Sequence, residues 1–302
     1  MLEPRTQPIL RYAAHAMWPV DEHFTHPDLE GVVLRARHYS PASESTTGAT
    51  LVLLHGAGAN AHWWDHVGPA LAEAGRVVAL DFRGHGDSHH PGHLETGAFG
   101  VDLAALLAHL GAPDAVLVGH SLGAHVALAH AAASRLTRGL VLVDAARGAS
   151  PSRRRATRLA LSLRRTHPTR EQALARFRFL PEATRASEAL RASIAERSVR
   201  AEPDGRFGYK FDPRWLGVAP GPRPDLAAVR CPTLLLRGAA SRLLTPEGAR
   251  ELATALPRCR LVEIEDAGHH VHIDRPEAVI REIRAFLEPI RSGCDGALSS
   301  PP

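Results

Sequence analysis

Short apolar runs alternate with longer amphipathic stretches along most of the chain. The apolar runs are rich in Val, Leu and Ile, as is typical of strands buried on both faces; they are residues 50–54, 76–80, 115–118, 139–143, 233–237 and 260–264. The stretches between them space their apolar positions as helices do, at residues 65–74, 97–110, 124–133, 246–256 and 276–289. This alternation predicts an α/β fold, with a mostly parallel twisted sheet and helices on both faces.

The N-terminal part adds two further strands. Residues 21–26 and 31–39, joined at a Pro27-Asp28 turn, predict an antiparallel pair that brings the sheet to about eight strands. Residues 1–18 are predicted to be a leader with a short helix at 9–18. We expect a polar loop at 41–48 and a frayed tail at 293–302.

The composition changes after the sixth predicted strand. Residues 147–215 lose the strand pattern, become rich in Arg and Ala, and are interrupted by Pro168, Pro181 and Pro203. We therefore predict a helical cap at 147–215, inserted between core segments 1–146 and 216–302. Its few large apolar residues either line an apolar pocket or pack the cap itself: Phe177, Phe179, Leu180, Tyr209, Phe211 and Trp215.

Composition excludes several classes of function. The 302 residues carry a net charge of only +4, and the Arg-dense stretch at 152–165 has no aromatic residue, which argues against nucleic-acid binding. The three cysteines form no close pair, which argues against a disulfide framework or a structural zinc site. No apolar run approaches the roughly 20 residues of a membrane span. We expect a cytoplasmic monomer or homodimer that acts on a small molecule, with no membrane partner.

One pentapeptide combines strand, turn and helix signals. Gly119-His120-Ser121-Leu122-Gly123 follows the run at 115–118 and precedes the helical pattern at 124–133. In a Gly-x-Ser-x-Gly turn the serine hydroxyl is lifted above the sheet edge, and side chains in place of the glycines would collide with the adjacent strand and helix. Ser121 is therefore the candidate nucleophile; an ordinary serine helix cap is the competing interpretation.

Other strand ends supply partners for Ser121. The loop His55-Gly56-Ala57-Gly58 allows close backbone approach, so the N–H groups of Ala57 and Leu122 are candidate donors to an oxyanion. His55 is expected to brace this loop, and Asp81 and Arg83 to be architectural. A serine needs a base, and three histidines follow the last strand: His269, His270 and His272. We favour His269, because Gly268 frees it to turn inward.

Together these motifs resemble the α/β-hydrolase superfamily, in the form that carries a helical cap. The resemblance rests on His55-Gly56-Ala57-Gly58, on residues 81–88, on the Ser121 pentapeptide and on Ala267-Gly268-His269, in the family's order. It implies Ser121 as nucleophile, His269 as base and Ala57 with Leu122 as oxyanion donors. It implies no metal and no organic cofactor.

The acid of the triad departs from the family pattern. The resemblance places it as Gly-x-x-Asp after the run at 233–237, but this chain has Gly238-Ala239-Ala240-Ser241. Some family members carry the acid one strand earlier, and Asp144 follows the run at 139–143. We assign the role to Asp144; Asp266, closer in sequence to His269, or the absence of any acid are the alternatives.

A serine at residue 121 restricts the chemistry. The resemblance implies that haloalkane dehalogenases and epoxide hydrolases need aspartate there. We expect a serine hydrolase that cleaves a carboxylic ester, lactone or thioester of a small to medium, partly apolar substrate through Ser121, His269 and Asp144. The alternatives are a cofactor-free biosynthetic enzyme, such as a thioesterase, cyclase or carbon–carbon hydrolase, and a non-catalytic small-molecule receptor.

Overall fold

A central eight-stranded sheet organises the chain in the computed structural model, which describes residues 19–39, 49–93, 95–163, 165–181, 183–218 and 223–291. The strand order is β1-β2-β4-β3-β5-β6-β9-β10. β2 is antiparallel to both β1 and β4, and all other neighbours are parallel. The strands are β1 Val20–Phe24, β2 Leu34–His38, β3 Leu51–Leu54, β4 Val77–Asp81, β5 Val116–His120, β6 Gly139–Val143, β9 Thr233–Gly238 and β10 Cys259–Ile264. The predicted sheet is confirmed.

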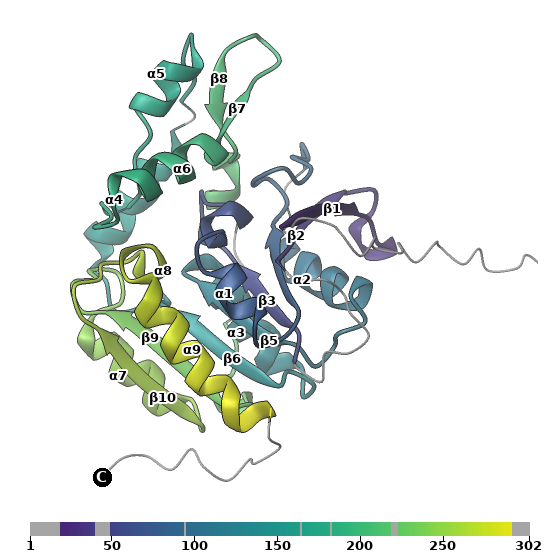
Figure 1. Cartoon of the computed structure of the whole chain (residues 1–302), viewed down its shortest axis with the longest axis vertical. Helices are drawn as coiled ribbons and strands as arrows, with labels where there is room; N and C mark the ends of the chain where they lie inside the picture. Colours follow the sequence, from purple (N-terminus) through teal and green to yellow (C-terminus); the bar gives the residue numbers. More distant parts are fainter. Residues whose placement is uncertain are drawn as a thin grey trace, which may run out of the picture.

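Helices cover both faces of this sheet (Figure 1). Alternation along β3 shows how the two faces are separated: Leu51 and Leu53 belong to one buried cluster, and Val52 and Leu54 to the other. The first cluster includes residues of α1 (Gly68–Ala72) and α9 (Pro276–Arg291). The second includes residues of α2 (Ala98–His109), α3 (Leu122–Ala133) and α7 (Pro246–Ala255). Burial on both faces explains why the strands are continuously apolar.

Buried ion pairs hold the loop after β4. Arg35 of β2 donates from Nη1 to Asp81 Oδ2 at 2.8 Å, and the Ala61 backbone N–H donates to Asp81 Oδ1 at 2.6 Å. Burial by itself would raise the pKa of Asp81, but the Arg35 charge and the backbone donors hold it below its ordinary value. Arg83 donates from its backbone N–H and from Nε to Asp102 at 2.9 and 2.7 Å. Both pairs bear out the architectural interpretation of Asp81 and Arg83.

The segment between β6 and β9 forms a separate layer over one end of the sheet (Figure 1). It contains α4 (Pro151–Ser162), α5 (Arg170–Ala175), α6 (Glu188–Ser198) and the 3-10 turn η3 (Pro213–Gly217). The prediction that it has no strands is wrong, because β7 (Val199–Ala201) and β8 (Phe207–Tyr209) form an antiparallel hairpin. Strands of three residues are too short to show a period of two in the sequence.

Several short helical elements differ from the predictions or were not predicted. The helix expected at 65–74 is shorter than predicted: α1 covers only Gly68–Ala72, with Pro69 in its first turn, and it follows a 3-10 turn, η2 (Ala61–Trp64). A short helix, α8 (Val271–Asp274), follows the histidine loop where no helix was expected. A further 3-10 turn, η1 (Pro27–Leu29), joins β1 and β2, and another, η4 (Leu226–Ala228), precedes β9. The predictions for 9–18, 41–48 and 293–302 lie outside the described residues.

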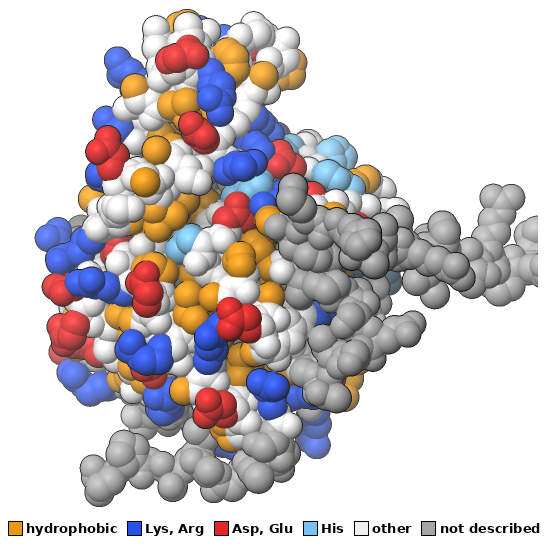
Figure 2. Space-filling model, viewed as in Figure 1, with side chains coloured by type: hydrophobic (Ala, Val, Ile, Leu, Met, Phe, Trp, Pro, Cys, Tyr) orange, Lys and Arg blue, Asp and Glu red, His pale blue; other side chains and the backbone are white. Residues whose placement is uncertain are grey.

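The visible surface carries charges of both signs. Lys and Arg side chains are interspersed with Asp and Glu over the inserted layer and over the core helices below it (Figure 2). In the described part of the chain, no helix combines the length and the apolarity that a membrane crossing requires.

Candidate active site

The site lies at the point in the sheet where the chain stops adding strands on one side of β3 and begins to add them on the other. The chain continues from β3 to β4 on one side and reaches β5 on the other, so the loops after β3 and β5 border a crevice at the carboxyl ends of neighbouring strands. Ligands of open α/β sheets bind at such a switch point.

Ser121 occupies a sharp turn between β5 and α3. Its backbone has φ 50° and ψ −108°, a conformation that L-residues rarely adopt. A Cβ at Gly119 would lie 2.4 Å from the Gly123 carbonyl carbon, and one at Gly123 would lie 2.4 Å from the Leu54 carbonyl oxygen in β3. The predicted reason for both glycines is thus confirmed, since a side chain at either would collide with helix or strand.

His269 and Asp144 meet across two loops. His269 Nδ1 lies 2.7 Å from Asp144 Oδ2, and both side chains are buried. A carboxylate only accepts hydrogen bonds, so Nδ1 carries the hydrogen and Nε2 is left as an acceptor. Of the other two candidate histidines, His272 stacks on Trp64 with ring centroids 4.4 Å apart, and His270 lines the same cavity as His269. The structure therefore pairs Asp144 with the histidine that the sequence favours.

Two further donors fix the Asp144 carboxylate. The Gly238 backbone N–H donates to Oδ1 at 3.1 Å, and Ser241 Oγ donates to Oδ2 at 2.6 Å. Asp266, the alternative acid, is 65% exposed and accepts from Arg275 Nη2 at 2.6 Å. Its carboxylate therefore belongs to a surface ion pair and not to the His269 pair.

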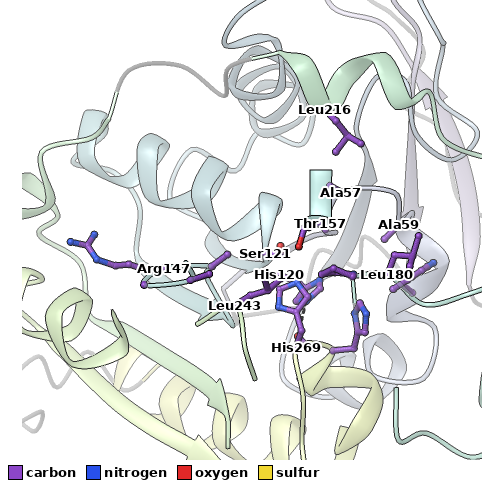
Figure 3. A pocket seen from close by; sticks show the side chains of 17 residues that line it. Ala57, Ala59, His120, Ser121, Arg147, Thr157, Leu180, Leu216, Leu243 and His269 are labelled. Carbon is purple, nitrogen blue, oxygen red and sulfur yellow. Dashed lines mark hydrogen bonds between the residues drawn. The ribbon is translucent and has the colours of Figure 1, made fainter. Parts of the chain in front are cut away.

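A cavity of about 270 Å³ opens above these groups (Figure 3). Ser121, His269 and Ala57 all line it, so the structure brings three of the predicted site residues to one space. Its other walls come from the segment after β6, from Thr157 in α4 and from the Leu180–Pro181 turn of the inserted layer. The inserted layer therefore forms part of the roof over the Ser121 turn.

The two candidate oxyanion donors flank the Ser121 turn. Ala57 lines the cavity, and Leu122 is the first residue of α3, so its N–H has no acceptor within the helix. The Leu122 side chain packs on the core instead of lining the cavity. His55 holds the Ala57 loop: the Phe82 N–H donates to Nε2 at 3.2 Å, which leaves Nδ1 to donate to the Gly56 carbonyl at 2.8 Å. This is the bracing role that the sequence predicts.

Comparison with known proteins assigns the chain to a family. The family model described as "Alpha/beta hydrolase family" matches residues 51–282. The chain is a member of this family. It is 32% identical over 249 residues to the esterase Rv0045c of Mycobacterium tuberculosis, covering 79% of this chain and 82% of the relative. It is 29% identical over 260 residues to the sn-1-specific diacylglycerol lipase ABHD11 of Danio rerio, covering 79% and 78%.

Solved structures agree with the observed fold. A crystal structure of an alpha/beta hydrolase from Novosphingobium aromaticivorans matches this alpha/beta hydrolase with a TM-score of 0.74 and 26% identity. The match covers 89% of this chain and 98% of the other. The predicted family and fold class are both confirmed.

Sequence reasoning missed two residues of this alpha/beta hydrolase that support the site. Ser241 was noted only for lacking a carboxylate, yet its hydroxyl donates to Asp144. Asp274 in α8 accepts from the Gly268 N–H at 2.7 Å, one residue before His269, and also from the Arg185 N–H of the inserted layer at 2.7 Å. The only sequence signal for Ser241 was its position in the Gly-x-x-Asp pattern; Asp274 had none.

His120 lines the cavity beside His269. Its Nε2 lies 3.0 Å from the His269 carbonyl oxygen, and the two rings are 4.8 Å apart. Burial, together with the neighbouring His272, His269 and His270, holds the pKa of His120 well below its ordinary value. His120 is therefore neutral and adds no positive charge next to His269. No group of three or more His, Cys, Asp or Glu side chains in the described residues is placed to hold a metal ion.

The large apolar residues of the inserted layer fall into two groups: some line a cavity, and others pack against neighbouring side chains. The sequence had left both roles open. Leu180 lines the main cavity, and Phe177, Tyr209 and Phe211 line a smaller one beside it. The remaining two pack against other residues: Phe179 lies 5.2 Å from the Trp63 ring, and Trp215 lies 5.2 Å from Phe99 in the core.

Proposed function

We propose that this alpha/beta hydrolase is a serine esterase that cleaves carboxylic esters of small to medium, partly apolar substrates. The observation that carries the proposal is the 2.7 Å contact between His269 Nδ1 and the buried Asp144 Oδ2, since His269 lines the same cavity as Ser121 in its strained turn. The esterase and the lipase among its relatives support ester hydrolysis.

The reaction follows from the tautomer of His269. With Nδ1–H donating to Asp144, Nε2 accepts the Ser121 Oγ proton as Oγ attacks the ester carbonyl carbon. The negative charge on the carbonyl oxygen is stabilised by the N–H groups of Ala57 and Leu122. The imidazolium then protonates the leaving alkoxide, and the alcohol departs from an acyl-Ser121 intermediate. Water, deprotonated by the same Nε2, attacks the acyl carbon and releases the acid.

The cavity sets the size and polarity of the substrate. Its volume of about 270 Å³ is near the lower end of ligand pockets. Trp63, Leu180, Leu216 and Leu243 contribute apolar walls. These walls favour a partly apolar ester whose reacting carbonyl lies beside Ser121.

A fluorophosphonate probe and a chain-length series of 4-nitrophenyl esters test the proposal. The wild-type protein is expected to be labelled and to hydrolyse the esters, and Ser121→Ala is expected to lose both activities. Ser134→Ala, at the other end of α3, is the matched control and is expected to keep both. Labelling or turnover that persists in Ser121→Ala would overturn the assignment, and an unlabelled wild-type protein would favour a receptor. A thioester and a lactone assayed beside the esters define the reaction subtype.

A further inference from the structure

A second, smaller cavity extends the site into the inserted layer. It measures about 70 Å³ and shares Ala57, Trp63 and Leu180 with the cavity above Ser121. The two cavities therefore lie next to each other and share part of their lining.

The lining of the second cavity combines aromatic side chains with positively charged ones. Phe177 and Tyr209 stand in edge contact with ring centroids 5.6 Å apart and, with Phe211, form an aromatic wall. Three of the other lining residues are arginines: Arg165, Arg176 and Arg178. Asp and Glu are absent from the described residues that line it.

The arginines differ in how they are held. Arg178 Nη1 donates to the carbonyl oxygens of Ala175 and Phe177 at 3.0 and 2.7 Å. Arg165 and Arg176 form no ion pair with a carboxylate anywhere in the described chain, whereas many other arginines of the protein do, including Arg35, Arg37 and Arg83. Uncompensated guanidinium groups around a cavity attract an anion.

The charges of these arginines also affect the pKa of two neighbouring groups, His167 and Tyr209. Burial lowers the pKa of His167, and the charges of Arg176, Arg206 and Arg165 lower it further. Burial raises the pKa of Tyr209, and the nearby arginines Arg165, Arg178 and Arg176 oppose that rise. The charged residues that shift the pKa of both groups are arginines, in agreement with the positively charged lining of the cavity.

We infer that the natural substrate carries an anionic group, a carboxylate or a phosphate, at the end remote from the reacting ester, and that Arg165 and Arg176 bind this group. The apolar part between the ester and the anion lies along Trp63 and Leu180, which both cavities share. This inference rests on the proposed esterase function and narrows it to an anionic ester or thioester.

Matched pairs of substrates test the inference and separate the two sources of the anion. In the first arm, 4-nitrophenyl half-esters of dicarboxylic acids with four to ten carbons are compared with neutral 4-nitrophenyl esters of equal length. In the second, acyl-coenzyme A thioesters, with phosphate on the leaving group, are compared with acyl-N-acetylcysteamine thioesters. The charged member of at least one pair is expected to have about tenfold higher kcat/KM, as two partly solvated ion pairs provide. Added salt should reduce this preference.

Variants locate the preference at the arginines. Arg165→Gln/Arg176→Gln is expected to bring the ratio of kcat/KM for charged over neutral substrate close to one. Arg170→Gln in α5, an arginine that does not line the cavity, is the control and should keep the wild-type ratio. A ratio near one in both arms for the wild-type protein, or a preference that survives in the double variant, would refute the inference.

Binding measured without turnover separates this inference from the esterase proposal. Calorimetry of the Ser121→Ala protein with monomethyl octanedioate and with methyl octanoate reports anion recognition even if the protein hydrolyses nothing. Tighter binding of the charged ester that is lost on adding the two arginine substitutions supports the anion site alone. Equal binding of both esters, beside normal ester hydrolysis by the wild-type protein, refutes the anion site and leaves the esterase function intact.

Discussion

Replacing Asp144 by Asn tests the whole catalytic arrangement, because the surroundings decide how an amide would lie there. Gly238 donates a backbone N–H to Oδ1, and a backbone donor cannot become an acceptor. The amide oxygen of an Asn would therefore take the Oδ1 position, and its NH₂ group would face His269 Nδ1. Nδ1 would then have to accept, so the imidazole hydrogen would move to Nε2.

A hydrogen on Nε2 prevents His269 from accepting the proton of Ser121. In a serine protease the equivalent substitution lowers kcat about 10⁴-fold, or roughly 5.4 kcal/mol of transition-state stabilisation, and we expect a loss of that order for Asp144→Asn. The measurements are kcat on a 4-nitrophenyl ester and the rate of fluorophosphonate labelling. Circular dichroism and a thermal melt establish that the variant is folded.

A control carboxylate shows whether the loss is specific. Asp266→Asn removes the other candidate acid, which pairs with Arg275 on the surface, and kcat is expected to stay within about twofold of wild type, since exposed pairs contribute little. A folded Asp144→Asn protein with near-normal kcat would refute the tautomer reasoning. Loss of activity in Asp266→Asn in its place would transfer the acid to that residue.

Ser241→Ala tests whether the hydroxyl of Ser241 supports the Asp144 carboxylate. It removes one charge-assisted donor from Asp144 Oδ2 and leaves the Gly238 and His269 contacts in place. We expect kcat to fall about tenfold, in line with the loss of one such hydrogen bond of roughly 1.5 kcal/mol. The same assays measure it, and a loss as large as that of Asp144→Asn would contradict a supporting role.

Three further substitutions test the framework. Gly123→Ala is expected to lower the free energy of unfolding in urea by about 2 kcal/mol or more, since its Cβ would lie 2.4 Å from backbone atoms. Gly100→Ala in α2, where a Cβ meets open space, should raise the free energy of unfolding by about 0.5 kcal/mol. Equal effects of the two substitutions would contradict the collision at Gly123. Asp81→Asn should cost about 1.5–3 kcal/mol, because it removes the negative charge that accepts from Arg35 Nη1, while Arg35 keeps its pair with Asp21. Because the folded pKa of Asp81 lies below its ordinary 3.8, its contribution is complete above that value and is lost as pH falls through the folded pKa, so the variant should show a shallower acid limb of stability. Asp274→Ala should lower kcat about tenfold, because the Gly268 N–H next to His269 loses its acceptor, and Asp274→Asn should restore part of the activity; an unchanged kcat would exclude a positioning role.

The sheet and the Ser121 turn were predictable because their signals are local. Each core strand is an apolar run bounded by turn residues, and the Gly119 and Gly123 requirement is written in five consecutive positions. The hairpin β7–β8 was not predictable from periodicity, since each strand is three residues long and pairs only within the inserted layer. The helix predicted from residue 65 begins only at Gly68, since residues 65–67 form a turn between η2 and α1, and Pro69 lies in the first turn of α1.

Residues that act through long-range contacts could be predicted only in part. Asp144 was proposed because it follows the strand after which some members of the family carry the acid, but its partner Ser241 lies 97 positions away and is recognised only when β6 and β9 are known to be neighbours. Asp274 joins the Gly268 loop to the Arg185 segment, two regions with no common sequence pattern. Such contacts depend on tertiary packing, which local periodicity does not encode.

The adjacency of β6 and β9 explains how the acid can stand on either strand. The strands are parallel neighbours in register from Leu140 opposite Thr233 to Val143 opposite Leu236, so the residues that follow them share one edge of the sheet. Ser241, in the position of the usual family acid, reaches the Asp144 carboxylate by a single hydrogen bond of 2.6 Å. The two positions are therefore close enough for one to supply the carboxylate and the other to donate a hydrogen bond to it, as Asp144 and Ser241 do here. In this chain the donor is a serine hydroxyl, which satisfies the buried charge that the acid brings to the site.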